Sequence, residues 1–353
     1  MPKIRVLIVD DSSFMRMALR GFLSRDPEIE IVGVAVDGAD GVSKAAQLHP
    51  DVITMDVEMP IMDGITALRR IMATTPTRVI MVSTLTCTGA AASFEALEAG
   101  AIDYVPKNVT DSQGVQEQFR TELLHKIKEA AHAAFGKSLS VAHTPAIVPL
   151  VERISSTSHP RRVKYIGIGA STGGPTAVQE VLSRLPASFP HAIMVAIHMP
   201  QAFTGAYAER LNSKCKLPVK EAAEGDILRP GQVLIAPGGK HATLVRRPEG
   251  VTVRFSPISE YPRYFYVPSV DLMMSSLADA AGGAMLGVIL TGMGNDGLKG
   301  MQHLKSRGGL TIVQDESTST IFGMPRACIE GGVADEILPL GQIGHAIGQL
   351  TGV

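Results

Sequence analysis

The chain has 353 residues, of which 45% are hydrophobic and 19% charged, and its formal net charge is −1. This length is enough for two domains, and the composition is typical of folded α/β proteins, so it excludes an intrinsically disordered chain. Residues 1–162 carry 17 basic and 19 acidic side chains, and the remaining residues carry 16 and 15. Neither half has the basic excess of a nucleic-acid-binding domain, so we expect no nucleic-acid partner.

The cysteine content and the hydropathy pattern favour a cytoplasmic protein. Cys87, Cys215 and Cys328 are too few and too widely spaced for a disulfide framework or a zinc site, which indicates a reducing compartment. The first residues enter a strand pattern at once and leave no room for a signal peptide. The longest weakly polar stretch, residues 280–290, is far shorter than the roughly 20 residues that span a bilayer, so no membrane insertion is expected.

Strands and helices alternate from residue 3 to about residue 135. Apolar runs predict strands, and each run is followed by a segment in which apolar residues recur at helical spacing. The predicted strands span residues 4–9, 29–36, 52–55, 79–83 and 102–106. Ser12 and Ser13 could cap the first helix, and the last helix carries residues 115–130. Strand–helix units in succession predict a flavodoxin-like, doubly wound (βα)5 domain over residues 3–135.

Charged residues stand at the ends of three of these strands. Asp10 and Asp11 end the first, Asp56 ends the third and Lys107 ends the fifth. The runs are almost continuously apolar, which is typical of strands in a buried parallel sheet, and ligands bind at the carboxyl ends of such strands. Three clustered carboxylates need cations, and a hard divalent ion plus one ammonium group would neutralise them. The pattern predicts a site that accepts a phosphoryl group on a carboxylate.

Residues 136–162, rich in proline and serine, are predicted to be a linker. A second alternation begins at Val163, and we expect a doubly wound, mostly parallel α/β domain over residues 163–350. Its predicted strands span residues 165–169, 193–197, 233–236, 251–255, 286–291 and 310–313, and a helix follows Pro175.

The loop Gly169–Gly174 follows the first of these strands and allows two interpretations. As a glycine-rich turn at a helix N-terminus it could hold a phosphate or a dinucleotide. As a G-x-S-x-G turn it could present Ser171 as a nucleophile. The dinucleotide interpretation is the weaker one, because Thr172 stands where that motif has glycine, and the next strand ends at His198 instead of an acid for the ribose.

His198 and Asp296 favour the nucleophile. Ser171, His198 and Asp296 each lie just past the end of a predicted parallel strand, so they should meet at one edge of the sheet. A serine, a histidine and an aspartate supply a nucleophile, a base and a group that orients the base. Two simpler interpretations stay open at this point: a histidine buried in the core, and a tight turn at residues 291–297 in which Asp296 caps a helix.

Known families share these motifs. With the acids and Lys107 in place, and with Ser83 and Tyr104, residues 3–135 resemble the receiver domain of bacterial response regulators. The second half resembles the protein-glutamate methylesterase domain of chemotaxis systems, which also acts as a glutamine deamidase. Its matching segments are residues 167–174, 196–200, 236–238, 268–271, 290–297 and 322–325.

The resemblance implies roles for the receiver residues. Asp56 would be the phosphoacceptor, Lys107 would pair with the phosphoryl group, and Mg²⁺ would be bound by three carboxylates and one carbonyl, those of Asp10, Asp11, Asp56 and Glu58. Ser83 and Tyr104 would report phosphorylation to the domain surface. Asn108 stands where receivers have a proline, so the cis peptide usual there is not expected.

In the esterase half, the resemblance makes Ser171 the nucleophile, His198 the base and Asp296 the residue that orients it. Thr172 and the backbone of Met293 would lie near the reacting carbonyl, and no cofactor is implied. The family pattern has basic residues just before the position of Pro268, but residues 264–267 of this chain are aromatic or aliphatic. The contacts that the family makes through this segment therefore cannot be assigned to this chain.

The implied function is phosphorylation-activated hydrolysis of glutamyl methyl esters on membrane chemoreceptors during chemotactic adaptation, with deamidation of receptor glutamines through the same acyl-enzyme. The expected partners are methyl-accepting chemoreceptors as substrates and a chemotaxis-type histidine kinase as phosphodonor, and the expected state is a monomer. The alternative is a response regulator with a DNA-binding or nucleotide-binding output domain, which the near-neutral charge of the second half disfavours.

Overall fold

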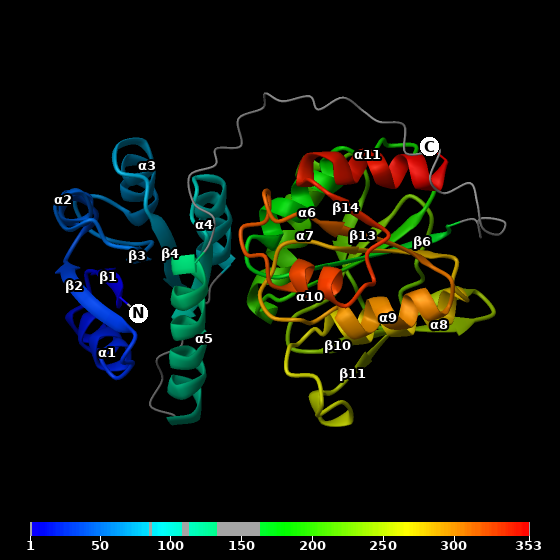
Figure 1. Cartoon of the computed structure of the whole chain (residues 1–353), viewed down its shortest axis with the longest axis horizontal. Helices are drawn as coiled ribbons and strands as arrows, with labels where there is room; N and C mark the ends of the chain where they lie inside the picture. The colour runs from blue at the N-terminus through cyan, green and yellow to red at the C-terminus, as the bar shows by residue number, and fades with distance from the viewer. Residues whose placement is uncertain (1, 85–86, 108–112, 133–162, 353) are drawn as a thin grey trace.

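The computed structural model describes residues 2–84, 87–107, 113–132 and 163–352, and these residues form two α/β halves (Figure 1). The N-terminal half has a parallel five-stranded sheet in the order β2-β1-β3-β4-β5. Its elements are β1 (Ile4–Val9), α1 (Ser13–Leu23), β2 (Ile29–Ala35), α2 (Gly38–Leu48), β3 (Val52–Asp56), α3 (Gly64–Thr74), β4 (Arg78–Thr84), α4 (Cys87–Glu98), β5 (Asp103–Lys107) and α5 (Gln113–His132).

Burial and capping explain these elements. The strands β1 and β3 are buried along almost their whole length, because helices cover both faces of the sheet. Three helices begin at a side chain that accepts a hydrogen bond from a backbone N–H of the first turn, and these caps are Ser12, Asp37 and Asp63. The predicted (βα)5 order is therefore confirmed, with element ends within a few residues of those expected.

The C-terminal half has a seven-stranded, wholly parallel sheet in the order β14-β13-β12-β6-β7-β9-β8. Its strands are β6 (Tyr165–Ala170), β7 (Ala192–Ile197), β8 (Val219–Glu221), β9 (Val233–Ile235), β12 (Met285–Ile289), β13 (Leu310–Gln314) and β14 (Glu336–Leu338). Its helices are α6 (Gly174–Ser183), α7 (Gln201–Lys214), α8 (Val270–Ala281), α9 (Leu298–Ser306), α10 (Met324–Glu330) and α11 (Leu340–Thr351), with a short 3-10 helix at Ile258–Glu260.

One predicted strand of this half lies outside the seven-stranded sheet. Residues 251–255 belong to β11 (Gly250–Ser256), which pairs antiparallel with β10 (His241–Arg247) in a separate hairpin. The sequence pattern did not predict β8, β10 or β14, because β8 and β14 are only three residues long and β10 ends in charged, exposed residues. The predicted linker, residues 136–162, lies outside the described residues.

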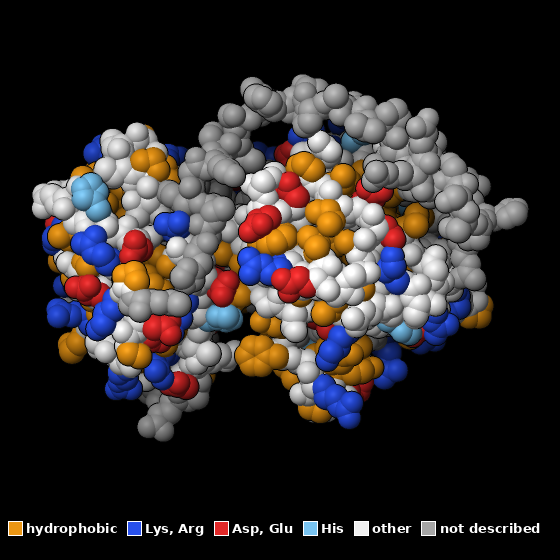
Figure 2. Space-filling view, viewed as in Figure 1, with side chains coloured by type: hydrophobic (Ala, Val, Ile, Leu, Met, Phe, Trp, Pro, Cys, Tyr) orange, Lys and Arg blue, Asp and Glu red, His pale blue; other side chains and the backbone are white. Residues whose placement is uncertain are grey.

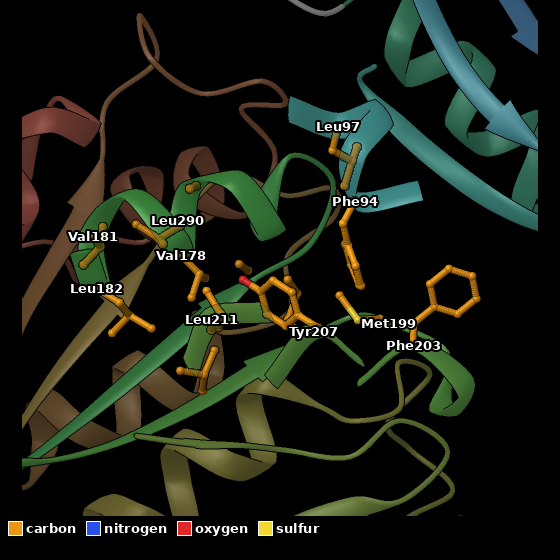
Figure 3. Close-up of a cluster of buried hydrophobic side chains, with 14 of the residues drawn as sticks. Phe94, Leu97, Val178, Val181, Leu182, Met199, Phe203, Tyr207, Leu211 and Leu290 are labelled. Atoms are coloured by element: carbon orange, nitrogen blue, oxygen red, sulfur yellow. The ribbon is translucent and has the colours of Figure 1, made fainter. Parts of the chain in front are cut away.

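The two halves meet through apolar side chains of α4 and α7. Phe94 of α4 packs against Phe203 and Tyr207 of α7, with ring centroids 6.3 and 5.4 Å apart. Tyr104 of β5 stacks on Phe203 at 4.7 Å and 11°. Figure 3 shows Phe94 pointing toward Met199 and Tyr207 of the C-terminal half, and Leu97 belongs to the same buried cluster. The cores of the two halves are therefore continuous at this contact.

Charge and hydropathy give no sign of a membrane segment in the ranges described. No helix there is at once long enough and apolar enough to cross a bilayer. The face in Figure 2 carries acidic and basic side chains interspersed over both halves.

Candidate functional site

The carboxyl ends of β1 and β3 bring three acids together in the N-terminal half. The chain runs outward from β1 to β2 and then crosses to β3, so the order of strands reverses between β1 and β3, where ligands bind in open α/β sheets. Asp10, Asp11 and Asp56 place one oxygen each within 4.8 Å of the others. Lys107 Nζ lies 3.0 Å from Asp10 Oδ2 and 2.5 Å from Asp56 Oδ2. The structure thus brings together the residues expected at this edge.

The charge of this acid cluster is incompletely compensated. Burial raises the pKa of Asp56; Lys107 and the N–H of Val57 lower it, Asp10 raises it further, and the net direction is upward. Asp10 Oδ2 is buried and accepts no hydrogen bond, although the Lys107 ammonium is near. A cavity of about 460 Å³ opens beside it, lined by Asp11, Asp56, Val57, Glu58, Met59 and Lys107. An oxygen without a donor, among carboxylates, fits a hard divalent cation.

Ser83 and Tyr104 lie deeper in the N-terminal half. The Ser83 hydroxyl is buried and donates to the carbonyl of Gly89 at 3.3 Å. Tyr104 is buried in the contact between the halves, where burial raises its pKa well above the ordinary value. Asn108, where a cis peptide was not expected, lies outside the described residues.

In the C-terminal half, Ser171 and His198 follow adjacent strands. Ala170 of β6 pairs with Ile197 of β7, and the His198 N–H donates to the Ala170 carbonyl at 3.2 Å. Ser171 and His198 are the next residues on each strand, so their backbones are about 5 Å apart. The hydrogen bonds of the described residues do not include one between the Ser171 hydroxyl and His198, whose Nδ1 is buried without a partner.

Asp296 holds the other ring nitrogen of His198. His198 Nε2 lies 2.8 Å from Asp296 Oδ2. Burial raises the pKa of Asp296, but the hydrogen bonds from His198 and from the backbone N–H groups of Val270 and Asp271 outweigh it and lower the pKa. With an ionised carboxylate as acceptor, the hydrogen must sit on Nε2, which leaves the lone pair on Nδ1.

Asp271 and Asp296 cap each other's helices. Asp296, just before α9, accepts from the N–H groups at the start of α8. Asp271, in the first turn of α8, accepts from Gly297 and Gly300 at the start of α9, each at 2.8 Å. A helix N-terminus carries partial positive charge, which favours both carboxylates, but burial and the nearby Asp296 leave the pKa of Asp271 raised. We call this pair the crossed caps; it fixes the Asp296 carboxylate beneath His198.

The glycine loop of residues 291–297 packs directly on the serine. The Ser171 N–H donates to the Thr291 carbonyl at 3.0 Å. A Cβ at Gly292 would lie 2.8 Å from the Ser171 Cβ, closer than side chains tolerate. Only glycine allows this loop to approach the serine so closely.

Thr172 and Met293, expected near the reacting carbonyl, both contact the N-terminal half. The Thr172 hydroxyl donates to Asp103 Oδ2 of β5 at 2.7 Å, and Lys126 of α5 lies 3.1 Å from the same oxygen. Met293 is buried in an apolar cluster formed mainly by side chains of the N-terminal half. The N-terminal half therefore covers two of the residues that surround Ser171.

Sequence reasoning missed Asp103 and Tyr266. Tyr266 stacks on the His198 ring with centroids 4.3 Å apart and planes at 7°. A signal existed for each: Asp103 is a charge inside a run predicted to be a buried strand, and Tyr266 belongs to the segment that departs from the family pattern. Neither signal indicated the contacting residue, which is Thr172 for Asp103 and His198 for Tyr266, each from a distant part of the chain.

Known proteins match both halves. The sequence model of the CheB methylesterase family matches residues 166–347, and that of the response regulator receiver domain matches residues 6–118. Protein-glutamate methylesterase/protein-glutamine glutaminase 1 of Geobacter sulfurreducens is 61% identical over 355 residues, which cover 99% of this chain and 98% of the relative. Enzyme 5 of the same name from Geobacter metallireducens is 61% identical over 350 residues, with coverages of 99% and 98%.

One solved structure covers the C-terminal half. The crystal structure of the Thermotoga maritima CheB methylesterase catalytic domain has a TM-score of 0.51 and 39% identity, and the match covers 53% of this chain and 98% of that one. The resemblance predicted from the motifs is thereby confirmed in both halves. Identity along nearly the whole chain, together with the two domain matches, means that this protein belongs to the CheB methylesterase family, carboxylic-ester hydrolases that carry a response-regulator receiver domain.

Proposed function

We propose that this enzyme hydrolyses glutamyl methyl esters of chemoreceptors through Ser171, His198 and Asp296, and that phosphorylation of Asp56 activates it. The observation that carries the proposal is the His198–Asp296 hydrogen bond of 2.8 Å, with the unpartnered Nδ1 of the same ring on the strand next to Ser171. Methanol release from methylated receptor membranes, with and without acetyl phosphate and Mg²⁺, tests it. Release no faster than the buffer blank would reject it.

The proposed reaction has two steps, acylation of Ser171 and hydrolysis of the acyl-enzyme. Ser171 Oγ attacks the ester carbonyl while His198 Nδ1 accepts its proton, and Asp296 stabilises the imidazolium through Nε2. The proton then passes to the leaving methoxide, and methanol departs from the acyl-enzyme. Water, deprotonated by His198, releases the glutamate. With a glutamine substrate the same steps expel ammonia, which is the deamidase activity.

The oxyanion is assigned to backbone donors of the two glycine loops. Within the described ranges, the N–H groups of Thr172 and Met293 donate to no protein acceptor, so both are available to a developing negative charge. Preorganised donors of this kind, at a site covered from water, stabilise the tetrahedral intermediate more than water does.

The proposed regulation rests on the contact between the halves. Thr172 and Met293 are held by the N-terminal half while Ser171 stays partly exposed, so movement of that half would open the site further to a receptor segment. Mg²⁺, when bound, would be held by the carboxylates of Asp10, Asp11 and Asp56 and by the Glu58 carbonyl, and would supply positive charge for the phosphoryl oxygens. A phosphate on Asp56 would compete for Lys107 and so favour one arrangement of the halves over another, as a population shift requires.

We assign residues 3–135 to the receiver domain, residues 136–162 to the linker and residues 163–350 to the catalytic domain. The proposed setting is the cytoplasm, with chemoreceptors as substrates, a chemotaxis-type histidine kinase as phosphodonor, and a monomeric enzyme. The esterase steps above use side chains and backbone only.

Replacing Asp56 by asparagine should abolish the stimulation by acetyl phosphate and Mg²⁺ and leave the unstimulated rate in place. The asparagine amide is close in shape to the carboxylate but cannot accept a phosphoryl group. Initial rates of methanol release, with and without the phosphodonor, measure the effect. Asp63→Asn is the matched control, because Asp63 only caps α3 and asparagine is an equally good cap, so this variant should respond normally. Stimulation of Asp56→Asn would contradict the assignment.

Replacing Asp103 by asparagine should raise the basal methylesterase rate in the absence of phosphodonor by about tenfold. The neutral amide keeps the shape but loses the charge-assisted part of the bond from Thr172, about 1.4 kcal/mol. Glu98→Gln is the control, since the Glu98–Arg210 pair at the partly exposed edge of the same contact should contribute less than 1 kcal/mol. An unchanged basal rate in Asp103→Asn would show that this hydrogen bond does not hold the halves together.

A further inference from the structure

The loop before α8 places an aromatic ring on the proposed base. Tyr266 lies parallel to His198, with ring centroids 4.3 Å apart and planes inclined by 7°. The His198 side chain is only 11% exposed, and the tyrosine ring lies over one of its faces. Tyr266 itself is half-buried. The sequence motifs assign it no role, and none of the steps described above uses it.

The remaining contacts of Tyr266 fix its position. Phe265 packs edge-on against it, with centroids 5.3 Å apart and planes at 90°. The backbone of Gly294 lies against the phenol: a Cβ there would be 2.9 Å from the Tyr266 hydroxyl oxygen. Gly294 has a φ of 79°, so glycine is favoured there on conformational grounds as well. The ring is therefore held between the glycine loop and the histidine.

We propose that Tyr266 is a positioning residue that clamps the face of the His198 imidazole, so that Nδ1 stays aimed at Ser171 while Nε2 stays on Asp296. This inference rests on the proposed esterase mechanism. One hydrogen bond to Asp296 leaves the imidazole free to rock about the Nε2 contact. A parallel ring at stacking distance removes that freedom, and the electron-rich face of the tyrosine attracts the imidazolium that forms when Ser171 gives up its proton.

The ring, and not the hydroxyl, carries this role. Burial raises the pKa of Tyr266, with Asp296 and Glu129 adding to the effect, so the phenol stays neutral in the neutral pH range. No hydrogen bond of the phenol is found within the described part of the chain. Phenylalanine at this position should therefore work as well as tyrosine, whereas leucine, which fills similar space without a π-face, should not.

The test compares Tyr266→Leu with Tyr266→Phe in the full chain, with acetyl phosphate and Mg²⁺ present. Tyr266→Leu should lower kcat for methanol release about tenfold and leave KM unchanged, the loss expected for one stacked pair and its imidazolium contact. Tyr266→Phe should keep the wild-type kcat. Tyr261→Leu controls for disturbance of the loop, because that ring packs on His241 and not on His198, and should also keep kcat.

A second measurement separates this inference from the proposed function. A fluorophosphonate ester should label Ser171: its Oγ bonds to phosphorus, His198 takes the proton and fluoride leaves. If wild type is not labelled and releases no methanol, the mechanism itself fails. If wild type is labelled and Tyr266→Leu is labelled equally fast, the clamp is wrong. The proton signals of the His198 ring should lie upfield in wild type and Tyr266→Phe, through the tyrosine or phenylalanine ring current, and move downfield in Tyr266→Leu. Equal positions in all three would also overturn the clamp.

Discussion

Replacing Ser171 by alanine should lower kcat for methanol release from methylated receptors by a factor of about 10⁴ to 10⁶. The side chain supplies the only oxygen proposed to attack the ester, and Ser171 follows the strand next to that of His198, whose Nδ1 has no hydrogen-bond partner. Without it no acyl-enzyme can form, and only the oxyanion donors and substrate binding remain to accelerate attack by water. The same variant should lose deamidase activity in equal proportion, because both reactions share the acyl-enzyme.

Ser183→Ala provides the matched control. Its hydroxyl donates to the Glu180 carbonyl within α6, the helix that follows the Ser171 turn, so the variant makes the same chemical deletion nearby. It should retain full activity. The thermal midpoints of both variants should stay near the wild-type value. If Ser171→Ala kept even a tenth of the wild-type rate, another nucleophile would have to be sought.

Replacing Asp296 by asparagine should lower kcat by about 10³ to 10⁴ with the active site still folded. The carboxylate accepts the hydrogen on His198 Nε2. The amide would instead donate its own hydrogen to Nε2, and the ring hydrogen would move to Nδ1. A protonated Nδ1 cannot take the proton of Ser171, so the base is lost while its position is kept. The pKa of Asp296 is lowered, so the carboxylate is ionised at every neutral pH and the deficit should not depend on pH there.

Asp271→Asn is the control for the structural part of this effect. Both acids belong to the crossed caps, and each variant weakens one helix start. Asp271 makes no described contact with His198, so its variant should lose stability with less than a tenfold change in kcat. Rates are measured with acetyl phosphate present, and stability by urea denaturation. Equal losses of kcat in the two variants would mean that Asp296 acts only through the fold.

The sequence predicted those features that depend on strand order and burial. The apolar runs before Asp10, Asp56, Ser171 and His198 were correctly assigned to parallel strands, and parallel strands end at a common edge of the sheet. Residues that follow such strands are therefore brought together whatever the details of packing. This is why the acid cluster and the Ser171–His198 neighbourhood could be expected before any coordinates.

Other contacts depend on packing between surfaces that have no repeating pattern. The bond from Thr172 to Asp103 joins residues 69 positions apart, one in the turn after β6 and the other in β5, and the docking of the halves decides it. Tyr266 reaches His198 from an irregular segment whose path follows no period. The crossed caps need two helix starts to face each other: the sequence suggested Asp296 only as a cap of the helix that follows it, whereas Asp296 accepts from the start of α8 and Asp271 from the start of α9.

The stack of Tyr104 on Phe203 has a consequence for how such enzymes can be rebuilt. Tyr104 belongs to the N-terminal half and Phe203 to the C-terminal half. A receiver domain taken from an unrelated regulator would therefore lack the ring that packs on Phe203. A chimera that keeps every residue of the proposed phosphorylation site could accept phosphate normally and still show no change in esterase activity. A working graft would then require exchanging the contacting surfaces of both halves together.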